Sequence, residues 1–246
     1  EKEQLHYMKI ELKGITFLIG LAGIAFFSCS DFNQKSESNS KEARRKFTFE
    51  ARDLAWKALS LREKIGQTML VLPQYEMELE IGNGSLEGFF KKYPVTGFFM
   101  GWKLYDGIDP ENWVEHLKKR ALEFQKASKL PLIFQEDYES GVWLEGMTPF
   151  PREMALGATN SPELAYNMGE SVGLECRSVG VSWVLHPVAD ININPFNPIA
   201  NTRSISDDPV KAIKLLSRQI AGLQNKGVAA TIKHFPGDGV DYRDQH

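Results

Sequence analysis

Two spacings of apolar residues alternate along the chain from about residue 60 onward. Short runs that are apolar on both faces predict buried strands: TGFFMG (96–101), PLIFQED (131–137), VSWVLHPVAD (181–190) and VAATIKHFPG (228–237). Longer stretches with helical spacing lie between them, at 111–128, 161–180 and 208–227. Because strands and helices alternate, the strands are expected to pair in parallel, which predicts an α/β fold.

Local signals mark the ends of the predicted helices. Ser60, with Glu63 three residues later, forms a capping-box pattern and predicts a helix that begins there. The apolar face of that helix is expected to carry Leu61, Ile65, Met69 and Leu70. The later helices are expected to begin at Ser161 and at Asp207 or Asp208, and to end at Gly180 and Gly227.

Polar residues gather directly after the predicted strands. Asp137 and Glu139 follow PLIF, His186 and Asp190 follow VSWVL, and Lys233 and His234 follow VAATI. The carboxyl ends of the strands carry the chemistry in a (β/α) barrel, and they bind ligands in a doubly wound sheet. The first strand-to-helix turns lack G-x-G-x-x-G and G-x-x-x-x-G-K-[ST], so no phosphate-binding loop is predicted. The sequence therefore favours a (β/α)8 TIM-type barrel over a doubly wound sheet.

The first 29 residues have the pattern of a targeting segment that starts at Met8. Lys9 and Lys13 precede an apolar run over 15–27, which is too short for a comfortable membrane span. The small residue Ser28 and then Cys29 follow this run. The order resembles a bacterial lipoprotein signal in which Cys29 is acylated. A plain signal peptide and an uncleaved anchor are the alternatives.

Residues 30–48 are polar and have no apolar period, so they are expected to form a flexible tether. The tether would join the membrane to a globular domain over 49–246. The expected location is therefore that of an exported bacterial lipoprotein, held at a membrane through its lipid, in the periplasm or at the cell surface.

Composition excludes several classes of protein. A net charge of −3 offers no basic surface for nucleic acid, so nucleic acid is not an expected partner. The chain has only 2 cysteines, and if Cys29 carries lipid then Cys176 has no partner for a disulfide framework or a cysteine-rich zinc site. Cys176 is expected to be a small packed residue rather than a nucleophile.

Five ordered segments carry a resemblance to a known family. They are SLREKIGQ (60–67), PLIFQEDYESG (131–141), VLHPVADIN (184–192), NTRSISDDP (201–209) and KHFPGDGVDYRDQH (233–246). Together they resemble the N-terminal domain of glycoside hydrolase family 3, above all its bacterial β-N-acetylglucosaminidases, from about residue 55 to the end. KHFPG followed by D-x-H is the most specific of them. The resemblance implies an incomplete N-terminal part of a (β/α)8 barrel, a carbohydrate substrate, and neither cofactor nor metal.

The resemblance also implies roles for particular residues. Family members of this kind use a histidine as general acid/base, held by an aspartate two positions earlier, and the matching pair is His246 and Asp244. With an ordinary pKa of about 6.5, a histidine can give and take a proton near neutral pH. The residues that match the family's sugar contacts are Asp137, Arg203, Lys233 and His234. The implied activity is that of a retaining exo-β-glycosidase acting on β-linked N-acetylglucosamine.

Structural roles compete with these functional ones. Arg203 or Asp137 could instead hold two loops together. His186 is expected to be packed and hydrogen-bonded rather than a ligand. Asp190 could equally belong to the structural wall of the fold or to the functional site. Ser140 occupies a glycine position of the family's D-x-E-G-G pattern, and VWLE ending in Glu145 follows where arginines are common. These departures leave a β-glucosidase-type specificity open. Asp238 stands where many relatives have a second histidine, and no role is assigned to it.

Three further alternatives remain at this point. A metal site could be built from His234, Asp238, Asp241, Asp244 and His246, whose side chains are suitable ligands, although no H-E-x-x-H spacing occurs. The chain could also be a lipoprotein that binds glycans without cleaving them, or phosphate could replace water as the acceptor. The family's nucleophilic aspartate lies beyond the D-x-H loop, so the chain as given is expected to be inactive alone.

Overall fold

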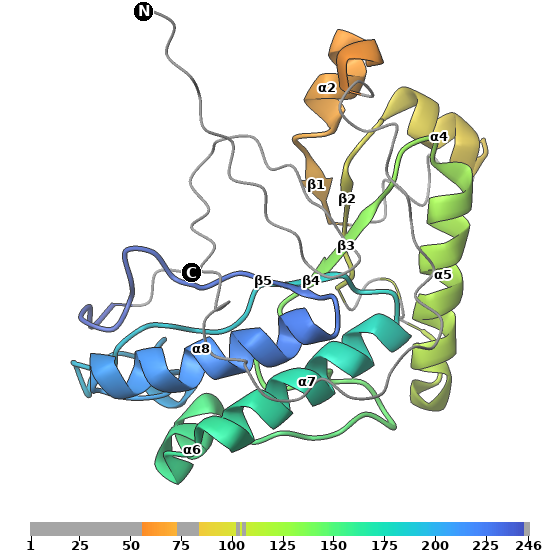
Figure 1. Cartoon of the computed structure of the whole chain (residues 1–246). Coiled ribbons are helices and arrows are strands. Elements are labelled where there is room, and N and C mark those ends of the chain that lie inside the picture. The colour runs from red at the N-terminus through yellow and green to blue at the C-terminus, as the bar shows by residue number, and fades with distance from the viewer. Residues whose placement is uncertain (1–55, 73–83, 102–103, 105–106, 244–246) are drawn as a thin grey trace, which may run out of the picture.

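The computed structural model describes residues 56–72, 84–101, 104 and 107–243 (Figure 1). Three residues with predicted roles lie outside this part: the lipidation candidate Cys29 and the acid/base pair Asp244 and His246. The predictions made for them therefore remain predictions.

A parallel sheet of 5 strands forms the centre of the described part. The strands are β1 (Leu70–Val71), β2 (Gly97–Phe99), β3 (Ile133–Glu136), β4 (Trp183–Val184) and β5 (Ala229–Ala230). Every neighbouring pair is parallel and the spatial order is β1-β2-β3-β4-β5, which confirms the α/β prediction. A doubly wound sheet reverses its strand order at a switch point, and these strands show no such reversal.

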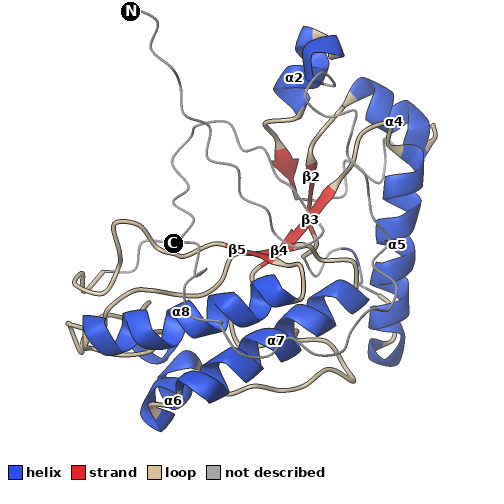
Figure 2. Cartoon of the chain, in the orientation of Figure 1, coloured by secondary structure: helices blue, strands red, loops and turns tan. Residues whose placement is uncertain are grey.

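Helices line one side of the curved band of strands (Figure 2). They are α2 (Leu61–Gly66), α4 (Leu86–Lys92), η3 (Pro110–Asn112), α5 (Trp113–Ala127), α6 (Glu153–Thr159), α7 (Pro162–Ser178), η4 (Asn201–Arg203) and α8 (Pro209–Asn225). The predicted N-cap Ser161 accepts from the backbone N–H of Leu164, and Asp208 rather than Asp207 caps α8. Gly180 and Gly227 follow α7 and α8 with φ of 90° and 77°, as expected of glycines that end helices. The sequence patterns did not predict α4 or α6.

The prediction for the first helix is partly wrong. Ser60 and Glu63 form the capping box, but the helix ends at Gly66 and Leu70 belongs to β1. The backbone N–H of Thr96 donates to the carbonyl of Met69, so pairing with the next strand replaces further helix. Three residues of the expected apolar face are exposed: Leu61 (74%), Ile65 (54%) and Met69 (50%).

Aromatic rings fill the space between the first strands and the helices beside them. Phe98 on β2 packs against Phe124 on α5 with ring centroids 4.8 Å apart, and against Phe134 on β3 at 6.4 Å. Phe90 on α4 meets Phe98 edge to face at 5.9 Å. Burial of such rings is a main source of folding free energy, so this cluster holds β2 and β3 against helices α4 and α5.

Helices α7 and α8 pack closely through glycines. A Cβ atom on Gly169 would lie 2.1 Å from the carbonyl oxygen of Gln219, and one on Gly222 would lie 2.2 Å from that of Tyr166. Only hydrogen fits at either position, so the two backbones touch. This contact sets the position of α8 and of the loops that precede and follow it.

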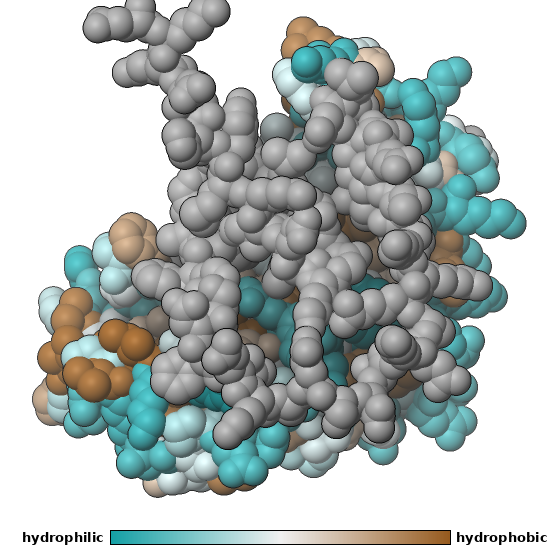
Figure 3. Space-filling view, in the orientation of Figure 1, coloured by the Kyte–Doolittle hydropathy of each residue, from teal (hydrophilic) through white to brown (hydrophobic). Residues whose placement is uncertain are grey.

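The surface carries apolar residues on the loops after β4 and β5. Ile193, Phe196, Phe235 and Val240 are all more than half exposed. Figure 3 shows brown, apolar surface at the left edge of the molecule, where Figure 1 places the loops around the start of α8. None of the helices in the described ranges is both long and apolar enough to cross a membrane.

Candidate functional site

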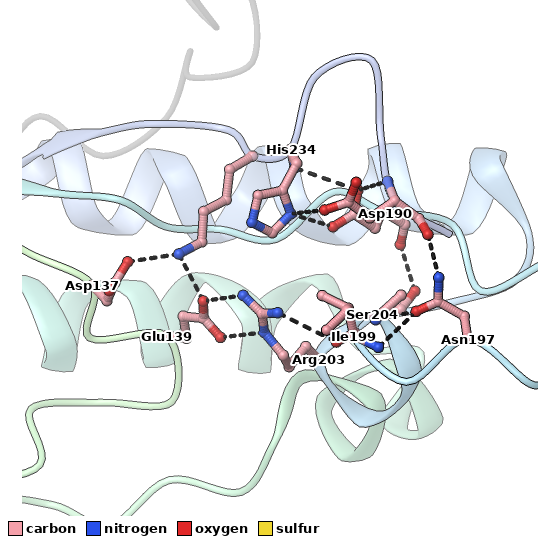
Figure 4. A network of polar contacts seen from close by, with 11 residues as sticks. Asp137, Glu139, Asp190, Asn197, Ile199, Arg203, Ser204 and His234 are labelled. Carbon is pink, nitrogen blue, oxygen red and sulfur yellow. Dashed lines mark hydrogen bonds and ion pairs between the residues drawn. The ribbon is translucent and has the colours of Figure 1, made fainter. Parts of the chain in front are cut away.

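Polar side chains from the carboxyl ends of three strands meet at one place (Figure 4). Asp137 and Glu139 follow β3, Asp190 follows β4, and Lys233 and His234 follow β5. An isolated bridge pairs Lys233 with Val188 beyond the ends of β4 and β5, so the parallel arrangement continues to the site. The sheet thus brings together residues that lie up to 96 positions apart in the sequence.

Lys233 joins the two carboxylates that follow β3. Its Nζ lies 2.6 Å from Asp137 Oδ1 and 2.7 Å from Glu139 Oε1. Tyr138, between the two acids, has a φ of 38°, in the left-handed region that few non-glycine residues adopt. The chain turns there, and both carboxylates reach the same ammonium group.

Arg203 on η4 binds the second of these carboxylates with both arms of its guanidinium. Nε and Nη2 donate to Glu139 Oε2 and Oε1 at 2.8 and 2.7 Å. Burial alone would raise the pKa of Glu139, but hydrogen bonds from Arg203 and Lys233 outweigh it and hold the pKa at about 2. The Glu139 bonds in turn raise the pKa of Arg203. The tie between loops that was weighed for Arg203 is therefore present.

His234 is held by a fully buried aspartate. Its Nδ1 lies 2.6 Å from Asp190 Oδ2 and 3.4 Å from Asp238 Oδ2. Asp190 Oδ1 accepts from the backbone N–H of Asp238 at 2.8 Å. Asp190 thus supports His234 and the backbone of Asp238 from a buried position, and whether it also takes part in the chemistry stays a prediction.

The network has an accessible layer above a buried one. The side chains of Asp137, His234 and Lys233 are 39%, 30% and 15% exposed, whereas those of Glu139 and Asp190 are 7% and 0% exposed. A partly exposed carboxylate, ammonium and imidazole, held in place by buried ion pairs, offer both acceptors and donors to clustered hydroxyl groups. The arrangement suits a polar, hydroxyl-rich ligand such as a sugar.

The predicted metal set is only partly brought together. Of its members, His234 and Asp238 lie together with Asp190, which was not in the predicted set, and each of these three offers an atom within 4.8 Å of the others. Asp244 and His246 lie outside the described residues. Both oxygens of Asp190 already take part in the contacts to His234 and Asp238, and a metal ion would have to displace the proton between Asp190 and His234. The carboxylate of Asp241, another member of the predicted set, binds Arg243 instead at 2.7 Å.

A second group of buried polar side chains lies between the end of β4 and the helices. His186 Nε2 is 3.5 Å from Glu153 Oε1 of α6, which also accepts from Gln219 Nε2 of α8 at 3.0 Å. Burial lowers the pKa of His186 to about 3 and raises that of Glu153 to about 8. At neutral pH the contact therefore joins two neutral groups. His186 is packed as predicted, but neither ring nitrogen has a hydrogen-bond partner within the described ranges.

Other sequence-predicted positions fall outside the network. Cys176 is fully buried and burial raises its pKa, which confirms a packed residue rather than a nucleophile. Glu145 is exposed and Ser140 is buried. Sequence reasoning gave no role to Glu139, although it lies in the D-x-E pattern that could have indicated one. It also missed Glu136 at the end of β3, whose pKa burial raises to about 7.

A cavity of about 370 Å³ lies away from this network, among α2, α4 and α5. Its lining includes Arg62 on α2, Pro94 and Val95 directly before β2, and Leu130 shortly before β3, so it opens at the amino ends of these strands. None of the network residues lines it. In parallel α/β domains the amino ends contribute to stability, and the candidate site is therefore the polar network at the opposite ends.

The chain is thus an α/β protein with a cluster of polar and charged side chains at the carboxyl ends of parallel strands. Residues 60–246 match the glycosyl hydrolase family 3 N terminal domain, and the chain belongs to that family. A beta-N-acetylglucosaminidase/beta-glucosidase of Cellulomonas fimi is 37% identical over 124 residues, which cover 50% of this chain and 22% of that protein.

Two solved structures resemble the chain over most of its length. A glycoside hydrolase family 3 beta-N-acetylglucosaminidase from Paenibacillus sp. str. FPU-7 has a TM-score of 0.64 and 30% identity, covering 76% of this chain and 35% of that one. A beta-glucoside phosphorylase, BglX, has a TM-score of 0.65 and 30% identity, covering 78% and 32%. The chain thus spans about a third of the length of these proteins, and about a fifth of the curated relative.

Proposed function

We propose that the protein to which this chain belongs is a retaining exo-β-glycosidase that removes terminal β-linked N-acetylglucosamine. The observation that carries the proposal is the network of Asp137, Glu139, Arg203 and Lys233, built from the ends of separate strands around an accessible carboxylate and ammonium. The described sheet would be the first part of a (β/α)8 barrel, whose carboxyl-end face is the usual place for an active site.

The proposed mechanism divides the work between sugar binding and proton transfer. Asp137, Lys233 and His234 would hold the hydroxyl groups of the terminal sugar, while Glu139 and Asp190 hold Lys233 and His234 in place. His246, oriented by Asp244, would protonate the glycosidic oxygen as a carboxylate from another part of the protein attacks the anomeric carbon. The leaving group departs with that proton, and His246 then takes a proton from water as the water oxygen displaces the carboxylate.

The carboxylate of Asp137, the ammonium of Lys233 and the imidazole of His234 suit the hydroxyl groups of glucose and of N-acetylglucosamine alike, so the choice of sugar is supported by the relatives. The names of the Cellulomonas and Paenibacillus proteins favour N-acetylglucosamine, and the first of them also names β-glucosidase activity. A β-glucosidase-type specificity is therefore the second candidate.

The test is an assay of the complete reading frame, expressed without residues 1–29. We expect release of 4-nitrophenol from 4-nitrophenyl β-N-acetylglucosaminide to exceed that from the β-glucoside. Cleavage of the glucoside alone would keep the reaction class and overturn the sugar. Sugar binding without cleavage of either substrate would favour a glycan-binding lipoprotein. A parallel assay with added phosphate separates the acceptors, since phosphorolysis yields a sugar 1-phosphate.

We further propose that the protein is exported and held at a bacterial membrane by a lipid on Cys29. The support is the order of charged, apolar and small residues before this cysteine. In cells grown with a labelled fatty acid, the wild-type protein is expected to take up label and to enter the detergent phase of Triton X-114. Cys29→Ser should do neither. An unlabelled wild-type protein would exclude the lipid on Cys29: it indicates an uncleaved anchor if the protein still enters the detergent phase, and a plain signal peptide if it does not.

A further inference from the structure

Asn197 makes hydrogen bonds with every part of its side-chain amide. It is 2% exposed and lies in the loop between β4 and α8. Its Oδ1 accepts from the backbone N–H groups of Ile199 and Ala200 at 2.8 and 2.6 Å. Its Nδ2 donates to the carbonyl oxygen of Asp241 at 2.7 Å and to that of Asp238 (Figure 4). The amide therefore faces two chain segments at once.

The two segments carry different parts of the proposed site. Residues 197–200 lead directly into η4, where Arg203 binds Glu139. The segment 238–241 follows Lys233 and His234 and runs on in sequence toward Asp244 and His246. A buried amide with all its hydrogen-bonding capacity in use fixes the distance between the segments, since an unpaired buried amide group would cost free energy.

We propose that Asn197 is a positioning residue: it fixes the loop that leads to the proton-transferring residues against the turn that carries Arg203. This inference rests on the proposed function. The side-chain amide of Asn197 bonds to backbone groups, and it would act through the carbonyl oxygens of Asp238 and Asp241. The expected consequence is on the placement of the general acid, with a smaller effect on sugar binding.

The two halves of the amide can be separated by substitution. Asn197→Asp keeps an oxygen that can accept from Ile199 and Ala200, but it turns the donor into an oxygen that faces two carbonyl oxygens. The turn before Arg203 should then persist while the segment 238–241 loses the two hydrogen bonds that Nδ2 donates to it. Asn197→Ala removes both halves and buries no charge, so it serves as the second variant if the aspartate variant does not fold.

Asn194 provides a matched control on the same loop. Its Nδ2 donates to the carbonyl of Val240 and its Oδ1 accepts from the backbone N–H of Phe196, both at 3.0 Å. It thus links a neighbouring part of the same loop, residues 194–196, to the segment 238–241 with the same chemistry, but these bonds are exposed to water, which can replace them. Asn194→Asp should therefore leave the site in place.

The measurement is the ratio of kcat/KM for two β-glycosides of the same sugar in the complete protein. One has the good leaving group 2,4-dinitrophenol, which needs no general acid, and the other has a poor leaving group such as 4-methoxyphenol. The ratio is internal to each sample, so a lower fraction of folded protein cancels. We expect Asn197→Asp to lower the poor-to-good ratio by about 10- to 100-fold, with inhibition by the free sugar little changed. Asn194→Asp should stay within about twofold of wild type.

The outcomes separate the inference from the function on which it rests. Equal losses on both glycosides in both Asn197 variants would show a merely structural residue and overturn the inference. The same shift of the ratio in Asn194→Asp would overturn it too, because any link between the segments would then suffice. If the wild-type protein cleaves neither glycoside, the proposed function fails, and the inference fails with it.

Discussion

Replacement of His246 by alanine is expected to lower kcat/KM on an unactivated β-glycoside by about 10²- to 10⁴-fold, the usual contribution of a general acid/base. The leaving oxygen of such a substrate must be protonated as its bond breaks, and the variant has no group to do so. A 2,4-dinitrophenyl glycoside leaves as a stabilised anion, so its first step should be much less affected. The comparison is made by initial rates in the complete protein.

The second chemical step gives an independent test of the same residue. In the variant, water lacks a general base, so the glycosyl-enzyme should accumulate when an activated substrate is used. Azide needs no deprotonation, and it should restore turnover and yield the β-glycosyl azide. His116→Ala is a suitable control, since His116 on α5 contacts the carbonyl of Leu104 at 2.9 Å and takes no part in the network. Equal losses on both substrates without azide rescue would contradict the assignment.

The fold was largely predictable because burial has a clear periodicity in this sequence. All the predicted strands exist, but their hydrogen-bonded parts are short: β4 covers only Trp183–Val184 of the predicted 181–190. Val181 and Val188 are fully buried outside that strand. An apolar pattern shows which residues are buried and not which residues form hydrogen bonds with a neighbouring strand. A strand predicted from it is therefore too long, because it includes the buried loop residues at its ends. The same limit explains the overlong first helix, where pairing with β2 prevailed.

Only those residues of the candidate site that belong to a recognisable sequence motif could be predicted. Asp137, Arg203, Lys233 and His234 were all named from sequence. The structure links the first three through ion pairs that involve Glu139 and Lys233, and it pairs His234 with Asp190. Asn197 gave no signal, because its partners lie 41 and 44 positions away and are backbone carbonyls. Contacts of this kind depend on how two loops meet, and neither periodicity nor spacing encodes that.

The buried pair of Glu153 and His186 is another contact that the sequence does not predict, and its effect on the pH dependence of stability can be measured. Gln219 lies 66 positions from Glu153, and nothing in the sequence indicates that these side chains meet. Once buried, Glu153 holds its proton until about pH 8, whereas its ordinary pKa is 4.5. The folded protein therefore binds a proton that the unfolded chain has lost over this whole range.

Stability should consequently fall as pH rises from 4.5 to about 8, and Glu153→Gln should abolish that part of the fall. The group's folded pKa is raised, so its contribution is complete below 4.5 and is lost through about 8. One pKa unit corresponds to about 1.4 kcal/mol. The free energy of unfolding of Glu153→Gln, relative to that of the wild type, should therefore rise by roughly 5 kcal/mol between pH 4.5 and about 8. Glutamine has nearly the same shape and can still accept from Gln219. Urea unfolding of the complete protein at several pH values measures the difference.

Two companion variants show whether the effect belongs to this carboxyl group. The stability of Glu136→Gln relative to wild type should stop rising near pH 7, since burial raises the pKa of Glu136 only that far. His186→Gln should change the pH dependence of stability between pH 6.5 and about 3, because the folded pKa of His186, about 3, lies below the ordinary 6.5. Wild type then loses stability as pH falls through that range, and the variant should not. A constant difference between Glu153→Gln and wild type from pH 5 to 9 would mean that Glu153 is ionised in the folded protein. In that case the Glu153–His186 contact would be a buried ion pair, and the neutral pair inferred from its burial would be wrong.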